Sequence, residues 1–233
     1  MSRTAMTRIS VACLDMAGTT VADEGIVMGA FTAAMERFGL RPGARGYDQA
    51  SRIVHETMGQ SKIEVFRRIL DSEADAQEAN CLFEISYAAS VKAGAVAPIY
   101  GATETLVALR ASGVRICLAT GFSPGTRDTL LDALGWRPLI DLALSPADAG
   151  RGRPFPDLPL TALLRLRGGA VAELAVVGDT ASDIESGVRA GAGVVAGVLT
   201  GTSTREELEL AGAHHIIESI TDLLPLVGVG AAR

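Results

Sequence analysis

The sequence is poor in cysteine and in aromatic residues. Of its 233 residues three are cysteine and one is tryptophan, and aromatic residues make up 4% of the chain. The cysteines Cys13, Cys81 and Cys117 are widely spaced and match neither a disulfide framework nor a zinc site, which is typical of the reducing cytoplasm. The N-terminus lacks the apolar core of a secretory signal, and no stretch reaches membrane-spanning length. We therefore expect a cytoplasmic protein that does not enter a membrane.

The sequence also has fewer basic than acidic residues. Lysine and arginine total 21 against 27 acidic residues, which gives a formal net charge of -6. A nucleic-acid-binding domain ordinarily carries a basic surface, so this balance argues against a nucleic-acid partner. It also disfavours anionic membranes. Since 48% of the residues are hydrophobic, the chain can bury a large core, and we expect its partners to be small molecules.

Short apolar runs that end abruptly in polar or glycine-bearing residues predict a parallel sheet. The runs are 9–14, 114–119, 139–144, 174–178 and 193–199. They are apolar throughout instead of alternating, which is typical of strands covered on both faces. Helix-like segments alternate with them at 103–112, 123–135, 180–191 and 204–212. This order predicts an α/β fold with a doubly wound, Rossmann-like parallel sheet.

The alternation of strands and helices is interrupted early in the chain. From about residue 25 to residue 95 the segments 26–39, 61–70 and 74–94 all have helical periodicity, with no convincing strand between them. We therefore predict a core domain of residues 1–22 and 96–233, with a helical cap domain of residues 23–95 inserted after the first strand.

Two short segments, one directly after the predicted cap and one inside it, have roles of their own. Residues 96–101, which contain a proline and a glycine, predict the linker that returns the chain to the sheet. The apolar stretch 26–35 could support a homodimer through the cap.

Polar residues follow the predicted strands at the edge where parallel sheets bind ligands. They are Asp15, Thr120, Gly121, Arg153, Asp179 and Asp183. Carboxylates such as Asp15 and Asp179 are hard oxygen ligands that suit Mg²⁺. A hydroxyl and an amide before the predicted helix at 123 make an anion site, and an arginine can bind phosphate oxygens. Each of these residues alone would be interpreted as an ordinary turn or helix-capping residue. Carboxylates, a cation site and an anion site at one edge of the sheet together indicate phosphoryl chemistry.

Four motifs in chain order resemble the haloacid dehalogenase superfamily of aspartate-nucleophile hydrolases. They are "LDMAGTT" (14–20), "LATG" (118–121), "GRGRP" (150–154) and "VVGDTASD" (176–183). The resemblance implies that Asp15 is a nucleophile that forms an aspartyl-phosphate. It also implies a Mg²⁺ site made by Asp15, the Ala17 carbonyl, Asp179 and Asp183. The implied phosphate-binding residues are Gly18, Thr19, Thr120 and Gly121, and Arg153 stands where most members have lysine.

Ala17 narrows the resemblance to the phosphonatase family. Most phosphatases of the superfamily carry a second aspartate at this position, which protonates the leaving alkoxide. Phosphonatases have alanine here and arginine in place of the lysine, and they break a carbon–phosphorus bond. In that family a cap lysine forms a Schiff base with the substrate aldehyde. The segment "MGQSK" (58–62) resembles the family's lysine segment, which implies that Lys62 is catalytic and that Met58 contacts substrate.

The match to the phosphonatases has departures. Val65 stands where that family has a histidine, and Phe122 where it has a tyrosine. His55 lies close enough in the sequence to replace the histidine, although a surface position is the plainer interpretation. A lysine at the start of a helix, such as Lys62, is also most often solvated.

Three functions therefore stay open at this stage. The favoured one is a Mg²⁺-dependent hydrolysis of a small organophosphorus compound of the phosphonoacetaldehyde type. The alternatives are a phosphomonoesterase of the phosphoglycolate-phosphatase kind and a catalytically weak regulator that binds a phosphorylated metabolite. A 2-haloacid dehalogenase is disfavoured, because those enzymes need no metal and "GDTASD" (178–183) supplies metal ligands.

Overall fold

A six-stranded parallel sheet forms the centre of the protein. The computed structural model describes residues 8–22 and 25–229. The strands are β1 (Val11–Asp15), β4 (Arg115–Ala119), β5 (Leu142–Leu144), β6 (Leu174–Gly178), β7 (Val194–Val198) and β8 (His215–Ile217). Their order across the sheet is β5-β4-β1-β6-β7-β8, and every neighbouring pair is parallel. The predicted α/β fold is thus confirmed.

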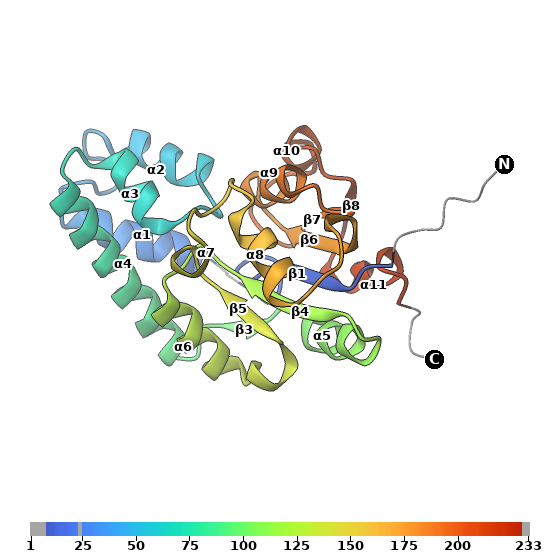
Figure 1. The fold of residues 1–233 in the computed structure, drawn as a ribbon. Helices are drawn as coiled ribbons and strands as arrows, with labels where there is room; N and C mark the ends of the chain where they lie inside the picture. The colour runs from blue at the N-terminus through green and yellow to red at the C-terminus, as the bar shows by residue number, and fades with distance from the viewer. Residues whose placement is uncertain (1–7, 23–24, 230–233) are drawn as a thin grey trace.

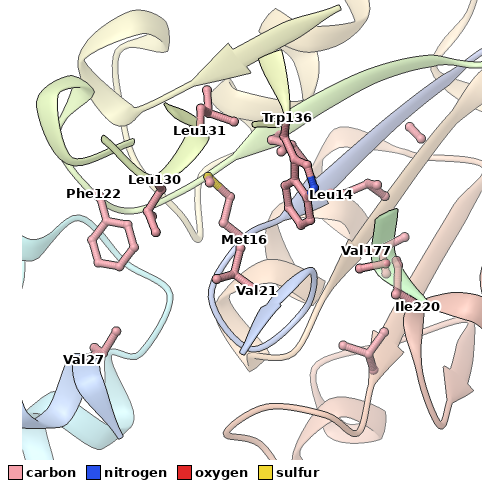
Figure 2. Close-up of a cluster of buried hydrophobic side chains, with 14 of the residues drawn as sticks. Leu14, Met16, Val21, Val27, Phe122, Leu130, Leu131, Trp136, Val177 and Ile220 are labelled. Atoms are coloured by element: carbon pink, nitrogen blue, oxygen red, sulfur yellow. The ribbon is translucent and has the colours of Figure 1, made fainter. Parts of the chain in front are cut away.

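Helices cover both faces of the sheet, as the apolar strands require. Along β1, Ala12 and Leu14 join one hydrophobic cluster, whereas Val11 and Cys13 join the other. The first cluster packs under α5 (Ala102–Ala111), α6 (Pro124–Leu134) and α11 (Leu223–Leu226), and the second under α8 (Asp157–Arg165), α9 (Ala181–Ala190) and α10 (Arg205–Leu210). Figure 2 draws part of the first cluster, from Leu14 on β1 outward. Alternate residues of β1 therefore pack against the helices on opposite faces of the sheet.

Four helices at the carboxyl end of the sheet form a second body of the chain (Figure 1). They are α1 (Ile26–Glu36), α2 (Tyr47–Glu56), α3 (Lys62–Ile69) and α4 (Glu73–Lys92). The short strands β2 (Val21–Ala22) and β3 (Ala97–Pro98) pair antiparallel at its base. Our division into a core and a cap of residues 23–95 remains a proposal, which this pairing supports because it joins the two connecting segments.

The helices of the cap share an aromatic centre. Phe31 of α1 packs against Phe66 of α3 and Phe83 of α4, with ring centroids 5.2 and 4.7 Å apart. The apolar residues of α1 are mostly buried here, within the chain. A homodimer through this helix stays a prediction.

The structure differs from the predicted elements in a few places. The strand predicted at 139–144 begins only at Leu142, because Arg137–Leu139 forms a 3₁₀ turn and the Asp141 carboxylate accepts the Ile116 amide and the Arg110 guanidinium. Residues 96–101, predicted as a linker, include β3. Among the described residues, helices α2, α8 and α11, the short helix α7 (Pro146–Ala149) and strands β2 and β8 have no counterpart in the prediction. Among the described residues, no helix combines the length and apolarity needed to cross a membrane.

Candidate active site

Three adjacent strands bring the predicted site residues to one edge of the sheet. Asp15 is the last residue of β1, opposite Ala119 at the end of β4. Thr120 follows β4, and Asp179 follows β6 on the other side of β1. The sequence therefore places these polar side chains together because the strands are parallel and in register.

Three buried carboxylates lie together at this edge. One carboxylate oxygen from each of Asp15, Asp179 and Asp183 lies within 4.8 Å of the others. Asp183 is held by its own helix start, where the Thr180 amide (3.1 Å) and hydroxyl (2.5 Å) donate to its Oδ2. This capping box fixes Asp183 at the N-terminus of α9, where the helix dipole favours a carboxylate.

Asp179 is oriented by two loops. The Thr19 hydroxyl donates to its Oδ1 at 3.0 Å, and the Thr202 amide donates to its Oδ2 at 2.9 Å. Gly18 adopts φ +87°, and a Cβ there would stand 2.5 Å from the Asp179 carboxylate. Gly18 and Thr19, predicted as phosphate-binding, are thus seen here packed against a carboxylate of the cluster.

Arg153 connects the carboxylates. Its Nη1 lies 2.7 Å from Asp15 Oδ1, and its Nε lies 2.6 Å from Asp183 Oδ1. Its Nη2 donates to the Ala119 carbonyl at 3.0 Å. Since the side chain is 5% exposed, one arginine from the loop after α7 is fixed between two acids and the end of β4.

The environment changes the acid strength of these groups. Burial raises the pKa of Asp15 well above its usual range, although the Arg153 guanidinium opposes the change. Burial and the neighbouring Asp183 raise the pKa of Asp179 to about 6. Burial alone would lower the pKa of Arg153, but Asp183 and Asp15 outweigh it and the pKa lies above its ordinary value. Arg153 therefore stays charged, while burial opposes the ionisation of Asp15 and Asp179, which a further cation nearby would favour.

The donor set fits a divalent metal ion. Its members are hard carboxylate oxygens, the ligand type that Mg²⁺ prefers. Three carboxylates and the Arg153 guanidinium leave a formal charge of −2 when all are ionised, which one divalent cation would neutralise. Asp15, Asp179 and Asp183 each offer one carboxylate oxygen to such an ion.

Lys62 lies inside the protein and not in solvent. It begins α3, is 5% exposed, and lines the same small cavity as Asp15 and Arg153. Its Nζ stands 5.2 Å from the ring centroid of Phe122, 5.6 Å from that of Phe31 and 6.0 Å from that of Phe83. The aromatic faces hold the amine by cation–π contacts.

The loop that carries Lys62 packs closely on the core. The Gln60 side-chain amide donates to the Ser182 hydroxyl at 3.3 Å, and the Arg153 guanidinium donates to the Gly59 carbonyl at 3.4 Å. The cavity beneath has a volume of about 30 Å³, and Met58 and Ala17 are among its lining residues. The predicted residues Asp15, Ala17, Met58, Lys62, Thr120, Gly121 and Arg153 all line it. A site this small and covered suits a small ligand.

One part of the predicted anion site has a different partner. From the sequence, the start of the helix at residue 123 is expected to bind the ligand phosphate together with Thr120 and Gly121. In the structure the Ser123 amide donates to the carboxylate of Glu84, a residue of α4, at 3.2 Å. This prediction was wrong, because a cap carboxylate occupies the N-terminus of α6. Thr120 and Gly121 remain at the cavity.

Several neighbours of the site were missed from sequence. Thr180 and Thr202 hold the carboxylates, and Phe31 and Phe83 surround Lys62. The loop "TGT" (200–202) after β7 carried the same signal as the other strand ends, a glycine and hydroxyl residues following an apolar run. The phenylalanines carried no local signal, since only folding of the cap places them around a lysine.

The histidine candidate lies elsewhere. His55 is exposed and lines a neighbouring depression with Glu207, beside Met58 and Thr180. Val65, at the position of the family's histidine, is buried in the cap core.

Comparisons with known proteins agree with this geometry. A family model described as haloacid dehalogenase-like hydrolase matches residues 9–191. A phosphonoacetaldehyde hydrolase of Parabacteroides distasonis is 27% identical over 94% of this chain and 95% of its own length.

Solved structures share the fold. A phosphonoacetaldehyde hydrolase-like protein from Oleispira antarctica has a TM-score of 0.83 at 26% identity, covering 98% of this chain and 94% of that one. A predicted phosphoglycolate phosphatase from Haemophilus somnus has a TM-score of 0.78 at 20% identity, covering 95% and 99%. The second likeness shows the fold alone.

Proposed function

The chain belongs to the haloacid dehalogenase-like hydrolases, and from that membership we propose that it hydrolyses the carbon–phosphorus bond of phosphonoacetaldehyde or a close analogue. The products are phosphate and the corresponding aldehyde. We further propose that Asp15 is the nucleophile and that Lys62 activates the substrate.

The observation that carries this proposal is Lys62 in its aromatic enclosure. Lys62 is 5% exposed and lines one cavity with Asp15 and Arg153. A lysine that merely contacts a phosphate monoester at a surface has no need for this position, whereas a lysine that bonds to an aldehyde carbon must lie in the same cavity as the nucleophile that attacks phosphorus. Ala17 supports the same interpretation, because a carbon leaving group requires no carboxylic acid to protonate an alkoxide.

In the first stage Lys62 attacks the substrate aldehyde. The amine nitrogen bonds to the carbonyl carbon and water leaves, giving a protonated imine. The phosphonate group is then bound by Thr120, the Gly121 amide and Arg153. The guanidinium suits phosphate-type oxygens because it can donate two parallel hydrogen bonds.

In the second stage Asp15 attacks phosphorus. A carboxylate oxygen forms the new bond to phosphorus while the carbon–phosphorus bond breaks, and its electron pair moves into the imine to give an enamine. Protonation of the enamine carbon and hydrolysis of the imine release the aldehyde and restore Lys62. Water hydrolyses the aspartyl-phosphate and restores Asp15, so the whole reaction consumes one water.

A divalent cation, for which we propose Mg²⁺, would be held by Asp15, Asp179 and the Ala17 carbonyl. It would supply charge neutralisation for the phosphonate oxygens. Asp183 would hold Arg153 in place from the opposite side, as their 2.6 Å ion pair suggests.

A phosphomonoesterase of the phosphoglycolate-phosphatase kind is the second candidate. The neighbour from Haemophilus somnus, a predicted phosphoglycolate phosphatase, shares the fold. In that case the cap would donate the proton that position 17 cannot supply. A regulator that binds a phosphorylated metabolite is the third, and it requires the same pocket without turnover.

The test is phosphate release from phosphonoacetaldehyde beside phosphoglycolate and other phosphate esters, with Mg²⁺. We expect kcat/KM for phosphonoacetaldehyde to exceed that for every ester. We also expect Lys62→Met to abolish the first activity, with a matched exposed lysine change, Lys92→Met, as the control. Release from phosphoglycolate alone favours the phosphatase, and binding of phosphate without Mg²⁺-dependent release favours the regulator.

A further inference from the structure

Glu84, a residue of the cap domain, places its carboxylate at the N-terminus of α6, a core helix beside the site. Glu84 on α4 accepts hydrogen bonds from the Ser123 amide (3.2 Å), from the Ser123 hydroxyl (2.5 Å) and from the Thr126 hydroxyl. These donors belong to the first turn of α6. The Ser123 hydroxyl also accepts from the Thr126 amide as the helix's own cap. Glu84 therefore satisfies donors at a positive helix end with a negative charge.

An apolar contact runs beside these hydrogen bonds. Phe83, the residue before Glu84, stacks on Phe122, the residue before Ser123, with centroids 6.1 Å apart. The Lys62 amine lies against both rings. We call the two pairs, Phe83–Phe122 and Glu84–Ser123, the seam. The seam joins the cap to the segment that begins with Thr120 and Gly121.

The groups that would touch a ligand are covered from both sides. Asp15, Lys62 and Arg153 are 6, 5 and 7% exposed, and the cavity that they line has walls from the cap, such as Met58, and from the core, such as Thr120. A substrate reaches these groups when the cap moves away from the core, and the cap returns for chemistry. The seam then opens and closes in each turnover.

We propose that Glu84 is a positioning residue for the reaction, because its bonds to α6 return the cap to the place where Lys62 faces Thr120 and Asp15. This inference rests on the proposed function for the role of Lys62. The proposal also accounts for the small site: Glu84 takes the N-terminus of α6, so the ligand anion is left with Thr120, Gly121 and Arg153.

The test separates cap closure from chemistry. Glu84→Ala and Glu84→Gln are compared with Glu78→Ala, a change on the same helix whose partner, Arg37, also lies in the cap. Hydrogen–deuterium exchange of the substrate-free protein at residues 57–62 and 120–126 reports closure. We expect Glu84→Ala to speed exchange there roughly tenfold, the scale of losing a charge-assisted hydrogen bond. Glu84→Gln restores part of the protection, and Glu78→Ala changes nothing.

Kinetics then test positioning. We expect Glu84→Ala to lower kcat/KM for phosphonoacetaldehyde about tenfold or more, with partial rescue by Gln. In a protein that already carries Thr126→Val, Glu84→Ala should lower kcat/KM by a smaller factor, because the hydrogen bond from the Thr126 hydroxyl to Glu84 is already absent. Faster exchange with unchanged kcat/KM, or no change in exchange, overturns the inference. A wild-type protein without activity on phosphonoacetaldehyde overturns the proposed function instead, and the exchange result still decides whether Glu84 closes the cap.

Discussion

At position 17 the chain has a methyl group, where most phosphatases that its motifs resemble carry a carboxylate. The residue lines the cavity between Asp15 and the cap, so a carboxylate at this position would face the bound ligand. Ala17 is therefore a position at which the two candidate reactions make opposite demands.

The change Ala17→Asp should separate these reactions. We expect hydrolysis of phosphoglycolate to rise by roughly 10²-fold, the lower range for general acid–base catalysis. Hydrolysis of phosphonoacetaldehyde should not rise, since no alkoxide leaves. Steady-state phosphate release on both substrates measures this, and Ala17→Asn serves as a control of the same size without the acid. An equal rise on both substrates would contradict the account.

The nucleophile has its own test. Asp15→Asn should lower phosphate release roughly 10³-fold or more, because an amide cannot take the place of a covalent nucleophile. The protein should still fold, because the substitution removes a carboxylate whose ionised form is disfavoured by burial, as its raised pKa shows. Thermal unfolding and phosphate release are measured together. Retained turnover in a folded Asp15→Asn protein would remove Asp15 from this role.

Among the elements, the loop before α3 and the loop after β4 bring the backbones of cap and core close together. A Cβ added at Gly121 would stand 2.3 Å from the Gln60 carbonyl oxygen, a backbone atom that cannot rotate away. The Lys62 amide donates to the Gly121 carbonyl at 3.4 Å across the same contact. Gly121 is needed here for close approach and not for an unusual backbone angle.

Gly121→Ala should therefore prevent full closure while keeping the backbone amide. We expect kcat/KM for phosphonoacetaldehyde to fall at least about tenfold, since small misplacements of reacting groups are costly. The Tm of the protein should change little, because the clash is relieved by displacing the loop. Gly125→Ala, on α6 where a Cβ meets only the Ser123 hydroxyl at 3.9 Å, is the control. Full activity of Gly121→Ala would show that this contact is not needed.

For the whole molecule, the concentration of acids at the end of the sheet makes stability depend on pH and metal. The folded protein holds Asp179 with a pKa of about 6, above the ordinary value of 3.8. The folded state thus binds this proton more tightly than the unfolded chain. The contribution to stability is fully present below about pH 4 and is lost as the pH rises through about 6.

A divalent cation should replace that proton. We expect Mg²⁺ to raise the Tm of the metal-free protein more at pH 7.5 than at pH 5, because ligand binding to the folded state stabilises it and the carboxylates are then ionised. Asp179→Asn should reduce the rise, while Asp157→Asn, at an exposed ion pair with Arg151, should not. Differential scanning calorimetry measures both. An equal rise at the two pH values, or one that Asp179→Asn leaves intact, would argue against the metal site.

The sequence predicted the sheet and the strand-end residues well, for a physical reason. Apolar strands that end in Asp15, Thr120 and Asp179 must align when they are parallel, so local pattern sufficed for the core part of the site. The sequence did not predict how the cap packs on the core. Neither the burial of Lys62 nor the capping of α6 by Glu84 has a local signal, because both depend on how distant helices pack.

One measurement tests the central claim most directly: borohydride reduction of the protein incubated with phosphonoacetaldehyde, followed by peptide mass spectrometry. If Lys62 forms an imine, reduction fixes the aldehyde-derived carbon skeleton on Lys62 and inactivates the protein, and Lys62→Arg shows no adduct. The account predicts one adduct on Lys62, formed only when both reagents are present. Phosphonoacetaldehyde turnover with no adduct on Lys62, or full turnover by Lys62→Arg, would contradict it.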